Sequence, residues 1–152
     1  MVSATGSKDA QQVTVIQRMV RDLNLNVQIV VCPIVREADG LALSSRNAYL
    51  NPEERRAATI LYRALQAARA EIAAGTRDAL EIQNRIRTVF NSEPLARLDY
   101  AEVVAADDFE SVVRVSRTSY VLVAAHLGRT RLLDNMLVEI PETNPAELVC
   151  HI

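Results

Sequence analysis

The residues best suited to chemistry lie in one polar loop, residues 36–50, which reads READGLALSSRNAYL. Ser44 and Ser45 offer two adjacent hydroxyl donors, and Arg46 offers a planar cation that can bind phosphate through two hydrogen bonds. The Asp-Gly pair at 39–40 predicts a turn, because glycine allows positive φ angles. The pattern predicts an anion-binding loop suited to the charge that develops on nucleotide phosphates during transfer. A solvated polar loop whose serines cap turns is the alternative.

A second candidate anion site lies at Lys8, the only lysine in the chain. It follows Gly6 and stands at the start of an expected helix, whose apolar residues recur at helical spacing. Ser7 is the expected N-cap of that helix. Free N–H groups and the helix dipole favour phosphate at such a position. An ordinary capped helix that carries a surface lysine is the alternative.

The other reactive side chains indicate no further site. Of the two histidines, His126 fits a core or edge position on an apolar strand, and His151 lies next to the end of the chain. Cys32 and Cys150 are far apart and lack the CxxC spacing of a zinc or redox site. No Ser/His/Asp set, P-loop or GxGxxG motif can be argued from the order of residues. These residues therefore predict neither a catalytic group nor a metal site.

Length and composition restrict the class of protein. The chain has 152 residues, 49% of them hydrophobic and 24% charged, which is ordinary for a soluble globular protein. The net charge of −2 argues against a general nucleic-acid binder. No apolar run approaches the roughly 18 residues of a membrane span, and the first residues lack the pattern of a signal peptide. We therefore expect a cytoplasmic protein that contacts neither nucleic acid nor membrane.

Before the polar loop, the pattern predicts one helix followed by one strand. The strand covers residues 27–31, which are largely β-branched and are expected to be buried, and Pro33 ends it. Helix followed by strand is half of a parallel α/β unit. Because its partner strands are expected to be absent, residues 1–34 are interpreted as the last αβ unit of a Rossmann-like, doubly wound nucleotide domain. Ligands of such sheets bind beyond the carboxyl ends of the strands, where the polar loop begins.

After the loop, the pattern predicts an α+β domain over residues 35–140. Asn51 should cap one long helix that ends at Gly75, and Thr76 should cap a second. Three strands follow, two of them joined by a hairpin turn at 128–130. The order of elements predicts a two-helix layer on a small three-stranded antiparallel sheet. Residues 141–152, which contain two prolines and no period, are expected to form a tail.

Three motifs together resemble one enzyme family. They are GSKDAQQ at 6–12, PIVREADGLALSSRN at 33–47 and GRTRLLDN at 128–135. In order and spacing they resemble pantothenate synthetase, over about residues 6–140. The resemblance implies a ligase of coenzyme A biosynthesis that uses ATP and Mg²⁺ to activate pantoate as an acyl adenylate, which β-alanine then attacks. It also implies a cytoplasmic protein that forms homo-oligomers, usually dimers.

The resemblance also implies roles for individual residues. It places Gln12 against pantoate and Val35 against the adenine side of ATP, and it places Lys8 toward the phosphates. The residues that it assigns to ATP binding are Gly6, Ser7, Lys8, Asp9, Val35, Leu43, Ser44, Ser45 and Arg46. No metal ligand is implied for this chain.

This chain departs from the family pattern in two ways. The family usually has an aromatic residue before the glycine at position 6 and Glu or Gln after it, where this chain has Thr5 and Ser7. The family's amino-terminal His-x-Gly-His signature and catalytic histidine have no counterpart here. We therefore expect a carboxy-terminal portion of the enzyme that is inactive alone. A non-enzymatic domain that self-associates or docks on a partner is the alternative.

Overall fold

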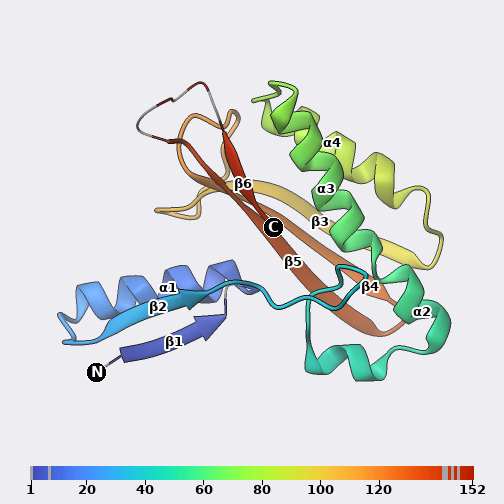
Figure 1. The fold of residues 1–152 in the computed structure, drawn as a ribbon, viewed down its shortest axis with the longest axis horizontal. Helices are drawn as coiled ribbons and strands as arrows, with labels where there is room; N and C mark the ends of the chain where they lie inside the picture. The colour runs from blue at the N-terminus through green and yellow to red at the C-terminus, as the bar shows by residue number, and fades with distance from the viewer. Residues whose placement is uncertain (1, 7, 142–143, 145, 147) are drawn as a thin grey trace.

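The computed structural model describes residues 2–6, 8–141, 144, 146 and 148–152. Its elements form two parts, a small β-α-β unit and a larger unit in which helices cover an antiparallel sheet (Figure 1). The polar loop connects the two parts. Within the described residues, no helix is long and apolar enough to cross a membrane.

The β-α-β unit contains a strand that the sequence did not predict. β1 (Val2–Gly6) pairs in parallel with β2 (Gln28–Cys32), and α1 (Ala10–Asp22) connects them. β1 was missed because its five residues, VSATG, are too short and too polar to show a strand period. The expectation that β2 is buried was wrong. Val30 and Val31 are 40% and 38% exposed, because β1 is the only strand that pairs with β2 among the described residues.

The larger unit is built on a four-stranded antiparallel meander. It consists of β3 (Ala96–Ala105), β4 (Ser119–Leu127), β5 (Thr130–Glu139) and β6 (Val149–His151), in that order across the sheet. The predicted hairpin turn between β4 and β5 is confirmed, and Gly128 takes a φ of +57° there. The prediction of a small antiparallel sheet is therefore confirmed, with one strand more than expected.

The additional strand, β6, lies in the segment that we expected to be a tail. Cys150 pairs with Val138 of β5, and His151 Nε2 lies 2.7 Å from Glu139 Oε2. Leu148, Cys150 and Ile152 alternate along the segment and pack against the core. This period-two pattern is too short to be recognised after two prolines, which is why the sequence suggested a tail.

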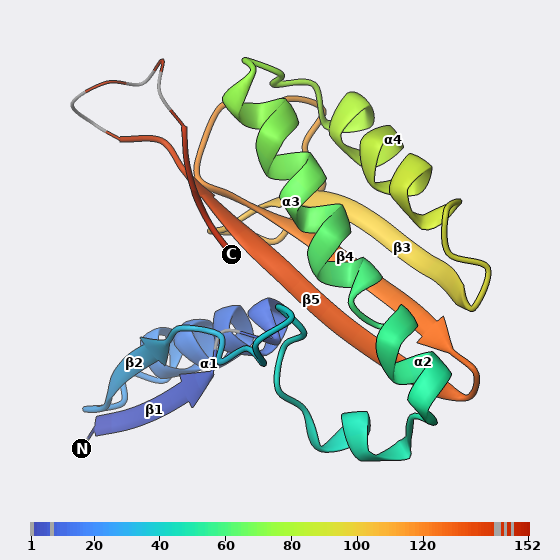
Figure 2. The ribbon, with the colours of Figure 1, turned by 45° about the vertical axis from the view of Figure 1, so that its right-hand side comes forward.

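Helices α3 (Ile60–Ala73) and α4 (Ala79–Phe90) lie on one face of the sheet (Figure 2). Their apolar stripes were correctly predicted to be core. The fully buried side chains at this layer include Leu61, Leu65, Ile82, Ile86, Val103, Val121, Val123 and Met136.

The expected single long helix is two helices. α2 (Pro52–Ala57) begins in a capping box formed by Asn51 and Glu54, and α3 begins three residues after α2 ends. Between them, the Thr59 hydroxyl donates to the Arg56 carbonyl oxygen at 2.9 Å. A local bond of this kind competes with the regular helical pattern and bends the chain.

Two expected N-caps were also wrong. Asp9 caps α1 by accepting from the Gln12 N–H, and Asp78 caps α4 by accepting from the Glu81 N–H. Ser7, the residue expected to cap α1, lies outside the described residues. The other expected cap, Thr76, lies before α4 begins. Aspartate competes with serine and threonine for this role, so several candidates in one stretch cannot be ranked from sequence alone.

A buried ion pair fixes the polar loop to the sheet. Arg36 donates to both carboxylate oxygens of Asp134 on β5, at 2.7 and 2.9 Å, and to the Gly40 carbonyl oxygen at 3.0 Å. The Arg36 guanidinium also lies 4.9 Å from the centre of the Tyr62 ring. The two charged side chains are only 12% and 2% exposed. The loop is thus anchored at one point to a strand almost one hundred residues away.

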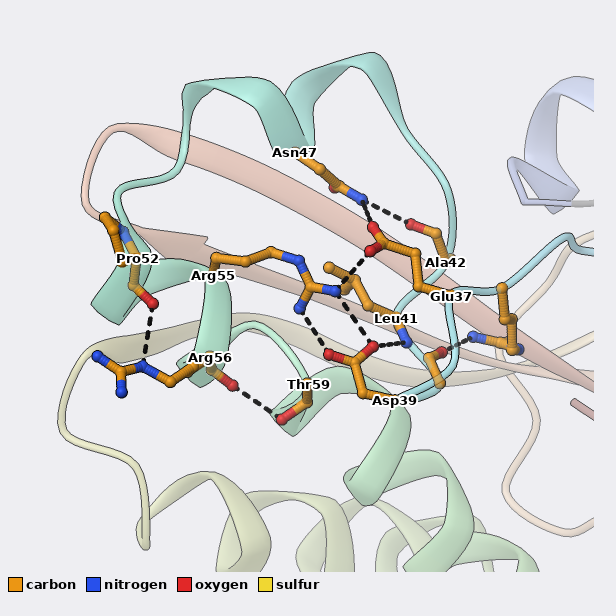
Figure 3. A network of polar contacts seen from close by, with 11 residues as sticks. Glu37, Asp39, Leu41, Ala42, Asn47, Pro52, Arg55, Arg56 and Thr59 are labelled. Atoms are coloured by element: carbon orange, nitrogen blue, oxygen red, sulfur yellow. Dashed lines mark hydrogen bonds and ion pairs between the residues drawn. The ribbon is translucent and has the colours of Figure 1, made fainter.

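A second polar network folds the loop onto itself (Figure 3). Arg55 of α2 donates to Glu37 at 2.7 Å and to Asp39 at 2.8 Å. The Asn47 amide donates to Glu37 Oε1 and to the Ala42 carbonyl oxygen. The hydrogen bond from Arg55 holds the pKa of Asp39 below its usual value. The shape of the loop is therefore set by its own side chains and by Arg55 before any ligand binds.

Gly40 allows the loop to pass close to α3. Its φ is +91°, and a Cβ atom there would overlap the Tyr62 ring. Gly75 has a similar φ of +106° but open space around the corresponding position.

Gly75→Ala should therefore cost about 1–2 kcal/mol of unfolding free energy through backbone strain alone. Gly40→Ala should cost about 1–3 kcal/mol more because of the clash. Urea unfolding measures both, and equal losses would contradict the close packing on Tyr62.

The Arg36–Asp134 pair yields a second prediction on stability. Asp134→Ala should destabilise the chain by about 3–5 kcal/mol, because it leaves a buried guanidinium without its counter-charge. Replacing both residues, as Arg36→Met with Asp134→Leu, should cost less than the sum of the two single changes. The control is Asp107→Ala, which removes a partner of Arg117 from an exposed pair. Its effect in urea unfolding should be much smaller, and a comparable loss would contradict the anchoring role of Arg36.

Candidate functional site

A cationic cleft lies where α1 begins, the polar loop ends and β5 begins. Its volume is about 310 Å³. Five of the residues predicted from the sequence line it, together with three residues of β5 that were not predicted. The lining residues are Lys8, Asp9, Gln12, Ser44, Arg46, Arg131, Leu132 and Leu133. Three cations from three separate segments therefore face one space, an arrangement that suits a polyanion such as a nucleotide's phosphates.

Lys8 connects the two parts of the molecule at this cleft. Its Nζ lies 3.4 Å from the Leu43 carbonyl oxygen, and its own carbonyl oxygen accepts from the Asn135 side chain at 2.9 Å. Burial lowers the pKa of Lys8; the nearby Arg46 and Arg36 act in the same direction, and Asp134 opposes them. A lysine that is partly desolvated among other cations gains more from an anionic ligand than a free surface lysine does.

Ser44 and Arg46 lie at the start of a short 3₁₀ helix, η1 (Ser45–Tyr49). Ser44 caps this helix by accepting from the Arg46 N–H at 3.3 Å, as the alternative interpretation of the loop expected. Its hydroxyl can still donate its own proton, so capping and ligand binding are compatible. The Arg46 side chain is exposed and donates to the Arg131 carbonyl oxygen at 3.2 Å.

Arg131 is the cation of the cleft that sequence reasoning missed. Its Nε donates to Asp99 at 2.8 Å, and its guanidinium lies 5.6 Å from the centre of the Tyr100 ring. These two contacts hold the side chain against the open face of the sheet. The residue belongs to the GRTRLLDN motif, but one arginine on a predicted strand gives no sign of which neighbours it meets. Only the pairing of β3, β4 and β5 shows that.

Several predicted site residues do not line this cleft. Ser45 is exposed in η1, Gly6 ends β1, and Ser7 lies outside the described residues. Val35 and Leu43 are 65% and 51% exposed, and the Leu43 N–H donates to the Val35 carbonyl oxygen at 2.9 Å. The structure brings Val35 and Leu43 together beside the cleft, and their predicted contact with ATP stays a prediction.

A second cleft, here called the sheet-face cleft, adjoins the first on the uncovered face of the sheet. Its volume is about 350 Å³, and it shares Lys8, Asp9, Arg131 and Leu133 with the cationic cleft. Its wall mixes apolar side chains such as Val104 and Leu122 with polar ones. The remaining residues are Ala10, Gln11, Tyr100, Glu102, Phe109, Asp134 and Asn135. The two clefts together could hold a phosphate chain beside a small organic group.

The described residues contain no group of three or more His, Cys, Asp or Glu side chains that could hold a metal ion. Asp9 is the carboxylate that lines both clefts. Magnesium is commonly bound by one or two carboxylates together with substrate phosphates rather than by a protein cage. The residues of this site fit magnesium binding through one carboxylate together with substrate phosphates.

Comparison with known proteins places this chain in a family. Residues 1–137 match the family model described as pantoate-beta-alanine ligase. Among curated relatives, the pantothenate synthetase of Roseiflexus sp. (strain RS-1) is 54% identical over 134 residues. That match covers 88% of this chain and 48% of the relative. The pantothenate synthetase of Carboxydothermus hydrogenoformans is 49% identical over 135 residues, which are 89% of this chain and 48% of that relative. The chain thus spans about half the length of the curated relatives it matches.

Solved structures agree with these relatives. Pantothenate synthetase from Thermus thermophilus is 40% identical with a TM-score of 0.83, over 88% of this chain and 48% of that one. The pantoate-beta-alanine ligase from Francisella tularensis, complexed with beta-gamma ATP and beta-alanine, is 28% identical with a TM-score of 0.58. It is matched over 88% of this chain and 42% of its own. The chain therefore belongs to the pantoate-beta-alanine ligase family.

Proposed function

We propose that this chain supplies the carboxy-terminal portion of a pantothenate synthetase. In the whole enzyme it would serve the ATP-dependent condensation of pantoate with β-alanine through a pantoyl adenylate. The observation that carries the proposal is the cationic cleft, where Lys8, Ser44 and Arg46 meet from separate segments. The family match does not favour the alternative of a non-enzymatic docking domain.

The two parts of the molecule fit this proposal as two pieces of an enzyme. Residues 1–34 would be the end of a Rossmann-like nucleotide domain, and the parallel pairing of β1 with β2 supports this. Residues 35–140 would be the lid domain, to whose sheet β6 adds a strand. Val30 on β2, Met19 on α1 and Leu23 directly after α1 are exposed, which supports further packing against these elements. A homo-oligomer or the rest of the enzyme would provide it.

Within the cationic cleft, Lys8 and Arg46 would hold the phosphates of ATP, and Ser44 would donate a hydrogen bond to them. Gln12 lines the same cleft and would hold pantoate beside them. Gly6, Ser7 and Asp9 would join Lys8 in contacting the phosphates, and Ser45 would assist Ser44. Val35 and Leu43 would border the adenine. The beta-gamma ATP in the complex of the Francisella tularensis relative supports ATP as the nucleotide.

Magnesium would accompany the phosphates in this proposal, with Asp9 as the carboxylate placed to contact it. The ion would supply counter-charge to the phosphates. The residues of the chain would orient the phosphate chain and pantoate, through the fixed loop on one side and α1 on the other. The setting would be the cytoplasm, since Cys32 and Cys150 are free thiols.

Arg46→Ala should weaken binding of a non-hydrolysable ATP analogue by about 1–3 kcal/mol, the scale of a charge-assisted hydrogen bond. Lys8→Ala should have an effect of similar size. The control is Arg85→Ala on α4, where an exposed arginine pairs with Glu71 far from the cleft. Isothermal titration calorimetry measures all three. An unchanged affinity in Arg46→Ala would remove this residue from the site.

The chain alone should form no pantothenate, because positioning by both halves of the site is needed to stabilise the transition state. Adding the amino-terminal half of the Roseiflexus sp. enzyme, produced separately, should restore turnover. The assay supplies ATP, magnesium, pantoate and β-alanine and detects AMP and pantothenate. Arg46→Ala in the same mixture should reduce the restored rate. Enzyme-like turnover by the chain alone would overturn the proposal that the site is divided.

A further inference from the structure

A third cavity, here called the arginine groove, lies between η1 and the β4–β5 turn. Its volume is about 490 Å³, and its lining residues are Arg46, Tyr49, Arg129, Thr130 and Arg131. Three of these five are arginines and two carry hydroxyl groups, so every lining residue can donate hydrogen bonds and none is a carboxylate. This composition is that of an anion site.

The charge of the groove is only partly neutralised by the protein. Arg131 pairs with Asp99. Among the described residues, no carboxylate lies within ion-pair distance of Arg46 or Arg129. Glu54 lies near the turn, where its Oε1 faces Gly128 and its Oε2 accepts from the Asn51 N–H, and it forms no ion pair with either arginine. Arg46 and Arg129 therefore line the groove without an ion-pair partner among the described residues.

The groove adjoins the cationic cleft. Arg46 and Arg131 line both cavities, and the hydrogen bond from Arg46 to the Arg131 carbonyl oxygen holds the two arginines together. Lys8 and Gln12 line the cleft and are not among the residues of the groove, whereas Arg129 lines the groove and not the cleft. An anion in either cavity could thus contact Arg46 and Arg131.

We propose that the arginine groove binds inorganic pyrophosphate as it leaves the cleft, an inference that rests on the proposed function. In that reaction a pantoate carboxylate oxygen bonds to the α-phosphorus of ATP. The bond from the α-phosphorus to the bridging oxygen breaks, and its electron pair leaves on pyrophosphate. Arg129 would give this anion a contact that ATP held in the cleft does not use, and so favour its separation from the bound adenylate.

The test titrates inorganic pyrophosphate and a non-hydrolysable ATP analogue separately into the purified chain. Arg129→Ala should weaken pyrophosphate binding at least about ten-fold, the scale of one charge-assisted hydrogen bond, and change analogue binding by less than about two-fold. Arg129→Lys should restore part of the loss, because it keeps the charge without the planar fork. Arg85→Ala, the exposed arginine on α4, should leave both affinities unchanged.

Each other outcome overturns one identifiable claim. Unchanged pyrophosphate affinity in Arg129→Ala overturns the groove as its site. Equal losses for both ligands overturn it as well, because Arg129 would then belong to the nucleotide site. If the parent chain binds pyrophosphate in an Arg129-dependent manner but no analogue, the groove stands as a pyrophosphate site and the proposed nucleotide role of the cleft fails.

Discussion

The architecture of the site depends on one buried ion pair, between Arg36 of the polar loop and Asp134 of β5. Two charges taken out of water are stable only when their geometry and remaining hydrogen bonds are satisfied. Here the two terminal nitrogens of the guanidinium donate to both carboxylate oxygens and to the Gly40 carbonyl oxygen, and the group lies over the Tyr62 ring, while its buried Nε has no hydrogen-bond partner among the described residues. The loop is fixed to the sheet at that point, and η1 consequently carries Arg46 to the start of β5.

The polar loop divides into residues that hold its shape and residues that face the clefts. Glu37, Asp39 and Asn47 are used in bonds within the loop and to Arg55. Ser44 and Arg46 remain directed to the cationic cleft. Most polar side chains of the loop therefore serve to hold its irregular backbone in one conformation, which costs conformational entropy. Ser44 and Arg46 are the two loop side chains that line the cleft, in a position set before binding.

The sequence predicted α1, α4 and the β4–β5 hairpin, and it selected Lys8, Ser44 and Arg46, which the structure brings to one cleft, because periodicity and side-chain chemistry are local properties. It did not predict β1 or β6, which are too short to show a period and form only by pairing with strands farther along or back in the chain. Arg131 was missed for the same reason. Its place beside Arg46 depends on strand pairing and on the anchored loop, and neither is encoded in its neighbours in sequence.

β6 also affects how the molecule meets other copies of itself. The family match ends at residue 137, within β5, and β6 pairs with the outer edge of β5 at Leu137–Glu139. An open strand edge presents unpaired N–H and C=O groups to which the edge of another molecule can bind. With β6 in place, that part of the edge belongs to a strand of three residues, and so short an edge offers few unpaired backbone groups to the sheet of a second molecule.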